Sequence, residues 1–498
     1  MTNLATNLVN TATAHPSNTA IAINGTHIPY AALLGAAAKV AGELAAAGIE
    51  PGDRVALILP NVPAYPVTFF GALLAGATVV PMNPLLKSGE IDFFFTDSGA
   101  KVAFVWPDFV EEATKGAVNS GTRIVVCDPM GPVAGQLAAA EPVTQPVERA
   151  DEDTAVILYT SGTTGRPKGA ELTHRNIHLN AHRSAQVILE ISDSDILMGC
   201  LPLFHVFGLT VGLQAAVLTG ASLALIPRFD PAAAIKTIQD EKVTVMLGVP
   251  TMYAAILHHP DGDTMDASSL RTCASGGSAM PAEVQRAFEK KFNCLILEGY
   301  GLSETSPVAS FNMPDRPTKS GTIGVAIPGC EMKLLDESGN EVGVGGVGEI
   351  AIRGDNVMKG YWANPEATAE AIPDGWFRTG DMATVDDEGY YTIVDRKKDL
   401  ILRGGMNVYP REVEELIYTH PDVLEVAVVA IPDDLLGENV GAAVALKPGA
   451  TTTVEEIQEW TKERIAAYKY PRKVWLVDDL PKGPTGKILR REVHPPTA

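Results

Sequence analysis

The chain has 498 residues, of which 46% are hydrophobic and 20% charged, and its formal net charge is −21. This length exceeds what one hydrophobic core organises, so we expect two or more domains, and the composition excludes general disorder. A strongly acidic surface repels nucleic acid and anionic lipid, which argues against general nucleic-acid binding.

The charge is unevenly distributed along the chain. From Arg396 onward there are 15 basic and 16 acidic side chains, so nearly all of the acidic excess lies before that point. The sequence therefore predicts two electrostatically different bodies.

Cysteine usage and the N-terminal segment favour a cytoplasmic protein. The five cysteines are widely spaced without a Cys-x-x-Cys pair, so neither a disulfide framework nor a zinc cage is indicated. The first residues lack the basic start and apolar core of a signal peptide. The apolar stretch 209–226 is interrupted by Gln214 and by Thr219-Gly220, so we expect a helix, a turn and a strand there, and no integral membrane contact.

The first three hundred residues alternate helical and strand patterns. A helical pattern covers 30–47, and short apolar strands are expected at 54–59, 78–81, 102–105, 123–127, 154–158, 222–226 and 243–248. This alternation predicts an α/β architecture with helices on parallel sheets.

The pattern becomes β-rich with glycine turns between about 320 and 395. Strands at 331–335 and 348–353, with a turn at 337–340, predict a barrel-like subdomain in this region.

An α+β pattern follows Asp395, with helices at 410–420 and 454–468 and a strand at 423–430. We therefore expect a large N-terminal domain, 1–395, and a small C-terminal domain, 396–498.

Residues 159–169 read Tyr-Thr-Ser-Gly-Thr-Thr-Gly-Arg-Pro-Lys-Gly and lie between the apolar strand 154–158 and a helix that Thr173 would cap. The glycines allow backbone N–H groups to turn toward an anion, while the hydroxyls and Lys168 add donors and charge. A Gly/Ser/Thr linker is the alternative, but such linkers rarely join a buried strand to a capped helix. Only two residues separate the first two glycines, so this is not a Walker A loop. We expect phosphate binding by Thr160, Ser161, Gly162, Thr163, Thr164, Gly165 and Lys168.

Three later segments carry chemistry that a nucleotide site needs. Gly-Tyr-Gly-Leu-Ser-Glu-Thr at 299–305 offers a flat ring and a carboxylate, Glu304, suited to Mg²⁺. Phe-Arg-Thr-Gly-Asp ends at Asp381, at a turn where a carboxylate suits both hydroxyls of a ribose, and Pro-Thr-Gly-Lys ends at Lys487 on a loop. Taken singly, Asp381 would be explained as an ordinary turn aspartate and Lys487 as a solvated lysine.

The chain also contains Leu-Pro-Leu-Phe-His-Val-Phe-Gly at 201–208, Ala-Ser-Gly-Gly-Ser-Ala at 274–279, and Asp-Arg-Lys-Lys at 395–398 followed by Gly404-Gly405. In this order, and with the segments above, these motifs resemble the acyl-adenylate-forming superfamily over nearly the whole chain. That superfamily includes acyl-CoA synthetases, beetle luciferases and peptide-synthetase adenylation domains. The resemblance implies a large N-terminal domain of two α/β subdomains and a β-barrel-like subdomain, and a small mobile α+β domain that swings about a hinge matching Lys398. It puts the active site between the two domains.

The resemblance implies an AMP-forming acid–thiol ligase that uses ATP, Mg²⁺ and coenzyme A. A carboxylate oxygen attacks the α-phosphate to give an acyl-adenylate and pyrophosphate, and a thiol then displaces AMP. Lys487 would stabilise the charge that develops at the α-phosphate, a contact made mainly in the transition state, and Glu304 would bind Mg²⁺. No protein nucleophile is needed, because CoA brings its own thiol.

Further binding residues follow by matching positions. The phosphate loop would hold the β- and γ-phosphates, while Asp381 and Arg396 would hold the ribose. Tyr300 with Gly277, Ser278 and Ala279 would enclose the adenine. Ser303 would contact phosphate, and the other cofactor-binding positions are Glu298, Gly299 and Gly301. Ser303 departs from the usual threonine, but its hydroxyl survives. The CoA contacts would be Arg228, Gly404 and Gly405, although a solvent-facing arginine explains Arg228 nearly as well.

His205 matches a residue that guards the acyl carboxylate in relatives, although a lone histidine among phenylalanines is otherwise most often a core residue. The acyl pocket would be drawn from a neutral set: Val206, Phe207, Val249, Thr251, Met252, Ala274 and Ser275. Amino-acid-activating relatives need an aspartate to pair with the ammonium, and 204–209 offers none. Malonate-activating relatives carry an arginine where this chain has Gly299, which we expect to leave room without supplying charge.

A neutral, largely apolar acid is therefore favoured, with a medium- or long-chain fatty acid first and an aryl propenoate of the coumarate type as the alternative. An acyl-AMP ligase with a carrier-protein acceptor and a non-catalytic nucleotide sensor also stay open. The chain retains Lys487, Glu304 and Asp381 together. This argues against the sensor, because a sensor does not need a group that acts only in the transition state. The expected partners are the acid, ATP and CoA, without nucleic acid, and the oligomeric state is open between monomer and homodimer.

His174, His178 and His182 recur at a spacing of four on one expected helix. They lack the acidic partner of a His-Glu-x-x-His zinc site, so we expect no metal there.

Overall fold

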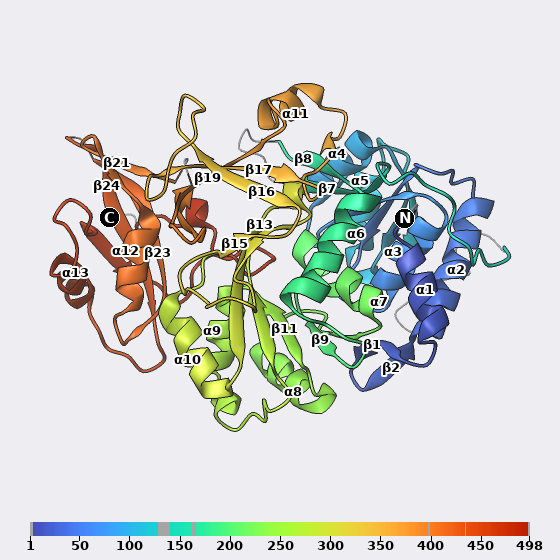
Figure 1. Cartoon of the computed structure of the whole chain (residues 1–498), viewed down its shortest axis with the longest axis horizontal. Helices are drawn as coiled ribbons and strands as arrows, with labels where there is room; N and C mark the ends of the chain where they lie inside the picture. The colour runs from blue at the N-terminus through green and yellow to red at the C-terminus, as the bar shows by residue number, and fades with distance from the viewer. Residues whose placement is uncertain (1–2, 128–139, 161–165, 397–398, 434, 497–498) are drawn as a thin grey trace.

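The computed structural model describes residues 3–127, 140–160, 166–396, 399–433 and 435–496, and the strands in these ranges form four sheets. Figure 1 shows the sheet nearest the C-terminus as a separate body on the left, together with helices α12 (Pro410–Tyr418) and α13 (Val454–Lys462). The other three sheets form the larger body to its right. The expected large N-terminal and small C-terminal domains are both present.

The largest sheet is parallel at its centre. In spatial order its strands are β15 (Val325–Ala326), β14 (Val308–Phe311), β13 (Leu295–Gly301), β12 (Thr272–Ser275), β11 (Val245–Gly248), β9 (Ile196–Gly199), β10 (Ser222–Leu225), β1 (Thr19–Ile23) and β2 (Thr26–Pro29). Ile21 of β1 pairs in parallel with Leu223 of β10, so the start of the chain forms an edge of this sheet. The layer therefore combines segments that lie far apart in the sequence.

The second sheet contains the expected early strands and two that the sequence did not predict. Its order is β18 (Gly360–Tyr361), β8 (Lys168–Thr173), β7 (Thr154–Thr160), β4 (Thr78–Pro81), β3 (Arg54–Ile58), β5 (Ala100–Val105) and β6 (Arg123–Val126). We expected a helix to follow the phosphate loop directly, and this was wrong, because β8 intervenes and pairs antiparallel with β7. Thr173 then caps α6 (His174–Arg183) as predicted, accepting a hydrogen bond from Asn176 N at 3.0 Å.

Helices cover these sheets and share one core with them. In the large domain they are α1 (Thr6–Ala14), α2 (Tyr30–Ala46), α3 (Ala64–Leu74), α4 (Ser88–Ser98), α5 (Val110–Gly116), α6, α7 (Ala215–Thr219), α8 (Pro231–Glu241), α9 (Pro250–His258), α10 (Ala282–Phe292) and α11 (Pro365–Ala371). Short turns are η1 (Pro107–Phe109), η2 (Ser184–Ile188), η4 (Pro260–Asp263) and η5 (Ser303–Thr305). The buried Tyr30 hydroxyl donates to the carbonyls of Ala216 and Ala221, which ties α2 to the first sheet. One hydrophobic cluster runs through both α/β layers.

The apolar stretch 209–226 has the structure predicted for it. A π-helical segment, η3 (Phe207–Gln214), continues into α7, and Gly220 then takes a left-handed conformation (φ +81°) before β10 begins. Among the helices in the described ranges, none combines the length and apolar character needed to cross a membrane.

The β-rich region forms an antiparallel sheet of β16 (Cys330–Leu335), β17 (Gly348–Gly354), β19 (Phe377–Val385) and β20 (Tyr391–Arg396). Asp336 holds the predicted turn, because its Oδ1 accepts hydrogen bonds from Ser338 N and Asn340 N. Within the described residues the sheet is open, since β16 and β20 each pair on one side. The expected barrel-like subdomain is thus an open four-stranded sheet that supplies one wall of the site.

The small domain has its own core around a mixed sheet. Its strands are β22 (Met406–Val408), β21 (Ile401–Arg403), β24 (Gly437–Leu446), β23 (Val423–Asp433) and β25 (Lys473–Leu476), and the turn η6 (Arg490–Glu492) follows near the end. Helix α13 ends at Lys462 and not at 468 as predicted. The N–H groups of Arg464 and Ile465 both bond to the carbonyl of Thr461, so the chain leaves the helix in a tight turn.

Candidate functional site

Tyr300 near the end of β13, Asp381 in the middle of β19 and Arg396 at the end of β20 meet in one cluster. The Tyr300 hydroxyl donates to Asp381 Oδ2 at 2.6 Å, and Arg396 Nε lies 3.2 Å from Asp381 Oδ1. Asp381 and Arg396 are also direct partners in the β19–β20 register. Burial raises the pKa of Tyr300 well above its usual range, so the phenol stays a donor. The structure therefore joins the residues predicted for adenine and ribose.

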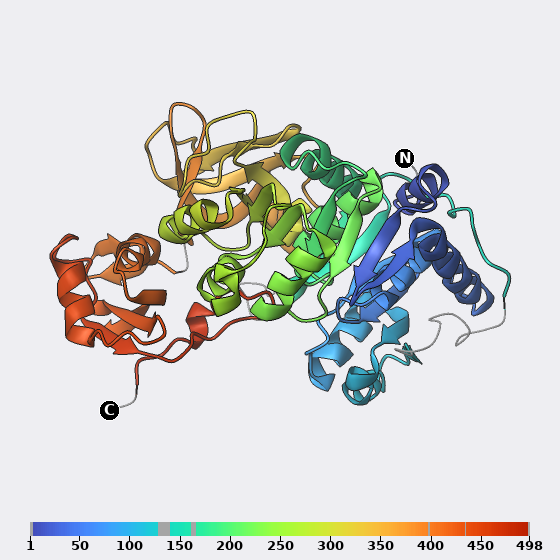
Figure 2. The same cartoon turned by 90° about the horizontal axis from the view of Figure 1, so that it is seen from below.

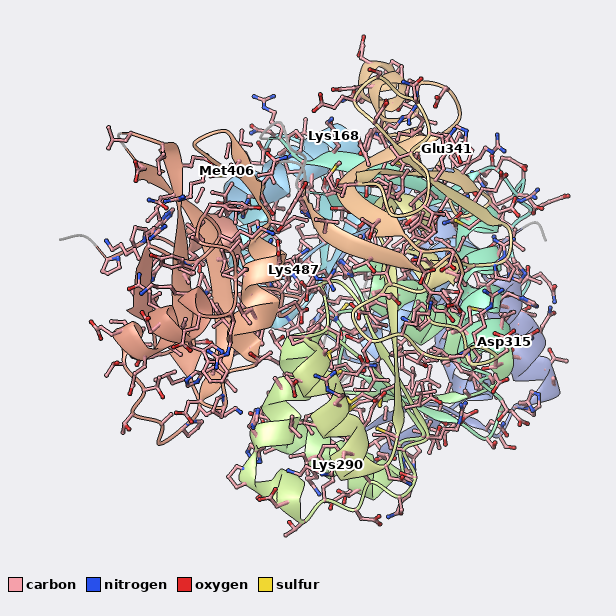
Figure 3. The ribbon with its side chains drawn as sticks, turned by 60° about the vertical axis from the view of Figure 1, so that its left-hand side comes forward. Lys168, Lys290, Asp315, Glu341, Met406 and Lys487 are labelled. Carbon is pink, nitrogen blue, oxygen red and sulfur yellow. The ribbon has the colours of Figure 1, made fainter. Side chains whose placement is uncertain are left out.

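Lys487 reaches this cluster from the small domain. It lies on a hairpin, 481–489, that is closed by bonds from Gly483 N to Lys487 O and from Leu489 N to Pro481 O, both 2.8 Å. Figure 2 shows a loop in the red of the last residues extending from the small domain beneath the large domain, and Figure 3 shows Lys487 at the boundary between the two. Burial, together with the neighbouring charge of Arg396, lowers the pKa of the half-buried Lys487 to about 8.

Glu304 forms a second polar centre in the large domain. Its Oε1 accepts hydrogen bonds from Thr160 Oγ1 at 3.2 Å and from Tyr361 Oη at 3.0 Å. Both hydroxyls donate to the same oxygen, Oε1, and no described residue donates a hydrogen bond to the other oxygen, Oε2. A carboxylate beside a hydroxyl is the hard-oxygen donor set that Mg²⁺ takes together with phosphate oxygens, so these residues fit the ion. Sequence reasoning missed Tyr361, which belongs to a two-residue strand far along the chain.

The phosphate loop is described only at its two ends. Ser161, Gly162, Thr163, Thr164 and Gly165 lie outside the described residues, as does the predicted hinge Lys398. Thr160 ends β7 and Lys168 begins β8, opposite each other in the hairpin. The Lys168 ammonium lies 5.2 Å from the centre of the Tyr361 ring, so both ends of the loop are close to the Glu304 centre.

The expected adenine loop follows β12. Gly277 is left-handed (φ +81°) and exposed, while Ser278 and Ala279 are half-buried. Glu298, in the middle of β13, supports this loop by accepting a hydrogen bond from Met280 N at 2.9 Å. Its Oε2 is buried without a hydrogen-bond partner among the described residues, and burial raises the pKa of the carboxyl to about 7.

The expectation that Gly299 leaves room for substrate was wrong. A Cβ at position 299 would lie 2.1 Å from Cδ2 and Cε2 of Phe311, because that ring from β14 covers the glycine. A Cβ at Gly301 would lie 1.9 Å from the carbonyl oxygen of Pro307. The two glycines therefore permit the close approach of β14, and Ser303 then starts the turn that carries Glu304.

The expected acyl residues are buried beside the nucleotide cluster. Val206, Phe207, Val249, Met252, Ala274 and Ser275 are all buried. A Cβ at Gly276 would lie 3.2 Å from the Phe207 ring and 3.5 Å from Gly299 O, so this ring borders the ends of β12 and β13. Thr251 Oγ1 donates to Gly486 O at 2.9 Å, which brings the start of α9 against the Lys487 hairpin.

His205 is half-buried next to these residues. Burial lowers the pKa of its imidazole to about 4, and the charge of Lys487 contributes to the same shift. The ring is therefore neutral near pH 7, and its Nδ1 accepts a hydrogen bond from Phe207 N at 3.3 Å.

The predicted CoA residues do not join the cluster in this arrangement. Gly404 and Gly405 are exposed, and Figure 3 shows the adjacent Met406 on the small domain well apart from Lys487. Arg228 is exposed after β10 and forms no ion pair with a described residue.

Two of the three histidines on α6 make contacts with the N-terminal segment. His174 is buried and its Nδ1 accepts a hydrogen bond from Leu4 N at 3.0 Å, while His178 Nδ1 lies 3.3 Å from Asn7 Nδ2.

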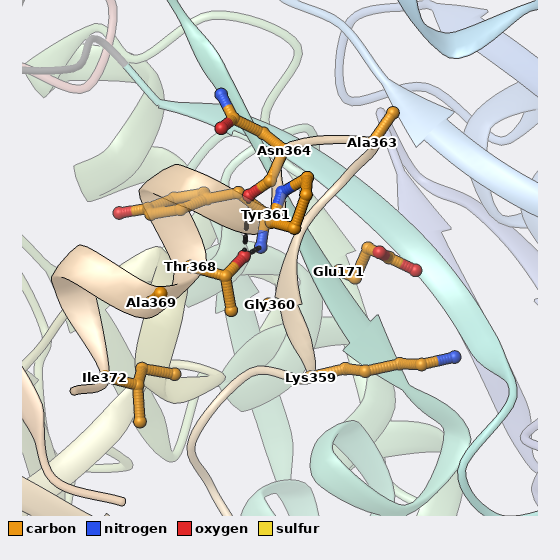
Figure 4. Close-up of a pocket in the computed structure, with 10 residues that line it drawn as sticks. Glu171, Lys359, Gly360, Tyr361, Ala363, Asn364, Thr368, Ala369 and Ile372 are labelled. Carbon is orange, nitrogen blue, oxygen red and sulfur yellow. Dashed lines mark hydrogen bonds between the residues drawn. The ribbon is translucent and has the colours of Figure 1, made fainter. Parts of the chain in front are cut away.

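A surface hollow of about 540 Å³ lies beside Tyr361 (Figure 4). It is lined by segments of β8, β18 and α11, where Tyr361 N donates to Thr368 Oγ1 at 2.9 Å. It shares Tyr361 with the site but has no charged cluster comparable to Glu304 or Asp381.

Comparison with known proteins agrees with this geometry and with the expected fold. The AMP-binding enzyme family model matches residues 8–362, and that of the AMP-binding enzyme C-terminal domain matches residues 412–487. A long-chain-fatty-acid–CoA ligase of Bacillus subtilis (strain 168) is 37% identical over 520 residues, covering 98% of this chain and 93% of that protein. A feruloyl-CoA synthase of an Amycolatopsis species is 41% identical over 482 residues, covering 96% of each. The crystal structure of ATP-bound MatB from Rhodopseudomonas palustris has a TM-score of 0.90 and 33% identity, covering 99% of this chain and 98% of that one.

Proposed function

The chain belongs to the AMP-binding enzyme family, and we propose that it activates a neutral, largely apolar carboxylic acid, with a medium- or long-chain fatty acid as the favoured substrate. At a coarser level it is an acyl- or aryl-CoA ligase that uses ATP and CoA. The observation that carries the proposal is the position of Lys487, which extends from the small domain to the Asp381–Arg396 pair at the domain boundary.

The first half-reaction joins the acid to the nucleotide. A carboxylate oxygen of the acid bonds to the α-phosphorus of ATP, the bond between the α- and β-phosphates breaks, and pyrophosphate leaves. Asp381 and Arg396 hold the ribose, with Tyr300 fixing the carboxylate and facing the base. Lys487 is cationic below its pKa of about 8 and stabilises the charge that develops on the α-phosphate.

The phosphates and the metal belong to the Glu304 centre. Glu304, with Thr160 beside it, would hold Mg²⁺, which when bound neutralises charge on the phosphate oxygens. Lys168 adds a fixed positive charge at the end of the hairpin. We also assign the segment Ser161 to Gly165 to the phosphates, which its backbone N–H groups and hydroxyls would bind.

The second half-reaction transfers the acyl group to CoA. The thiol sulfur bonds to the acyl carbon, the bond from that carbon to the phosphate oxygen breaks, and AMP leaves. Gly404 and Gly405 are exposed here, so we infer that the small domain, 396–498, turns about a hinge at Lys398 to bring them to the large domain, 1–395. We retain Arg228 as a contact for the CoA nucleotide. His205, neutral at pH 7, contacts Phe207 N and is close enough to Lys487 for that charge to lower its pKa.

The acyl pocket supports a neutral acid. The residues assigned to it are uncharged and buried, and the rings of Phe207 and Phe311 flank the pair Gly276 and Gly299. A second carboxylate on the substrate would be desolvated there without a cation to pair with it. The fatty-acid ligase relative agrees with this reading.

An aryl propenoate is the second candidate, favoured by two observations. One is the feruloyl-CoA synthase relative. The other is the fully buried pair Thr210 and Gln214 on η3, whose Oγ1, Nε2 and Oε1 atoms lack partners among the described residues. Such atoms suit a ring hydroxyl better than a methylene chain. An acyl-AMP ligase with a carrier-protein acceptor would form the adenylate but release no AMP with CoA.

The test is CoA-dependent AMP release over a panel of acids. Burying one methylene stabilises by about 0.8 kcal/mol, so kcat/KM should rise about fourfold per CH₂ along saturated fatty acids until the pocket is full. Acetate should be poor and dicarboxylates poorer. Activity that peaks at acetate or malonate would contradict the apolar pocket, and a preference for coumarate or ferulate over octanoate would select the second candidate.

A further inference from the structure

The Lys487 ammonium has no hydrogen-bond partner among the described residues. Its position therefore depends on how hairpin 481–489 is held against the large domain. Two contacts flank the lysine, one immediately before it and one three residues after it.

The first contact joins the hairpin to α9. Thr251 Oγ1 donates to Gly486 O at 2.9 Å, and a Cβ at Gly486 would lie 3.0 Å from Val249 Cγ2 and 3.1 Å from Thr251 Oγ1. Gly486 is left-handed (φ +80°), so both its conformation and its neighbours favour glycine. The hairpin thus rests directly on the first turn of α9.

The second contact is a cluster around Arg490. Its Nη1 donates to Asp395 Oδ1 at 3.1 Å, and its Nε donates to Glu414 Oε1 at 3.1 Å. Glu414 is itself fixed, because Oε1 also accepts from Val428 N at 2.8 Å. Asp395 lies at the end of β20 in the large domain, with its side chain 2% exposed. Arg490 therefore ties the end of the hairpin both to α12 and across the domain boundary.

We propose that Arg490 and Thr251 are positioning residues for the adenylation half-reaction, holding the two ends of the Lys487 segment so that its ammonium faces the Asp381–Arg396 pair. This inference rests on the proposed function. Neither residue touches the reacting atoms, and both act through the placement of Lys487.

The contacts are specific to this arrangement of the domains. The Asp395 carboxylate accepts from Arg490 and, at 3.1 Å, from Arg411 N, both in the small domain. The Arg411 guanidinium also donates to the carbonyls of Ile393 and Gly321 in the large domain. A rotation of the small domain breaks all of these bonds, so the anchors support adenylation and not thioester formation.

The test compares Arg490→Gln and Thr251→Val with Arg491→Gln, a matched control whose side chain is 74% exposed. Arg490→Gln should slow acid-dependent ATP–pyrophosphate exchange about 10- to 100-fold, because charge-assisted bonds are lost, and leave the reaction of supplied acyl-adenylate with CoA within twofold. Thr251→Val should act in the same direction more weakly. Arg491→Gln should match wild type, and Arg490→Lys should recover part of the loss.

A distance measurement provides a readout independent of turnover. The described cysteines are all buried, so Lys290→Cys on α10 and Glu455→Cys on α13, both exposed, can be spin-labelled selectively. Arg490→Gln should broaden the distance distribution away from the docked arrangement, and Arg491→Gln should not.

Equal losses in both half-reactions with an unchanged distance distribution would overturn the proposal, as would wild-type exchange rates in Arg490→Gln. If Arg490→Gln does not fold, Thr251→Val decides the matter by the same criteria. Failure of the proposed function has a different signature, since wild-type protein would then show no pyrophosphate exchange with any acid while the distances still respond to Arg490.

Discussion

At the scale of single residues, burial determines the charge of two groups that we propose for the active site. Lys487 and His205 are neighbours and both have lowered pKa values, about 8 and about 4, with burial as the main cause. Near pH 7 the lysine is therefore cationic and the imidazole neutral. A cation from the hairpin 481–489 therefore lies near the pair Asp381 and Arg396.

The pH dependence of adenylation should report this lysine. Its pKa is lowered, so the ammonium is present below about pH 8 and is lost as the pH rises through that value. We expect pyrophosphate exchange at saturating ATP to fall above about pH 8, and Lys487→Arg, which stays charged, to be slower but flat from about pH 7 to 9.5. If the exchange rate of Lys487→Arg also fell with a midpoint near the same pH, the decrease would belong to another titrating group.

At the scale of the elements, periodicity predicted the strands and helices whose patterns are long or repeated. The strand Thr78–Pro81 agrees residue for residue with the prediction, and the apolar stretch 209–226 was correctly divided. The strand β8 was missed because its six residues gain their partners from β7 and from β18, almost two hundred residues later. Tyr361 was missed for the same reason, since nothing in its local sequence indicates contact with Glu304.

The direction in which side chains point could also not be predicted from the sequence. The sequence matched Gly299 to a family position, but whether the space beside this glycine is open depends on the neighbouring strand β14. Phe311, its partner in the register, fills that space.

Gly299 and Phe311 should therefore be energetically coupled. Gly299→Ala forces a methyl group into the ring and should destabilise the fold by about 1–3 kcal/mol. In the double variant with Phe311→Leu the two effects should be less than additive, with a coupling of about 1 kcal/mol by urea denaturation. Gly343→Ala is the control, because a Cβ there meets no described atom within 4 Å. Strict additivity would mean that the ring does not restrict position 299.

At the scale of the whole molecule, motif order was the strongest signal in the sequence. It predicted two domains with a site between them, and the structure brings together residues from 160, 300, 381 and 487 along the chain. The relative arrangement of the domains could not be predicted, because it depends on contacts such as Arg490 with Asp395 that carry no local pattern. In this arrangement Lys487 is docked and Gly405 is exposed, and we propose this arrangement for the adenylation half-reaction.

The most direct test of the central claim is to measure the two half-reactions separately in Lys487→Ala, with Lys290→Ala on the exposed face of α10 as control. The account predicts that acyl-adenylate formation slows by about 10² to 10³, the usual cost of losing one transition-state donor, while supplied acyl-adenylate reacts with CoA at nearly the wild-type rate. Equal loss in both half-reactions, or an unchanged rate of adenylation, would contradict the assignment of Lys487.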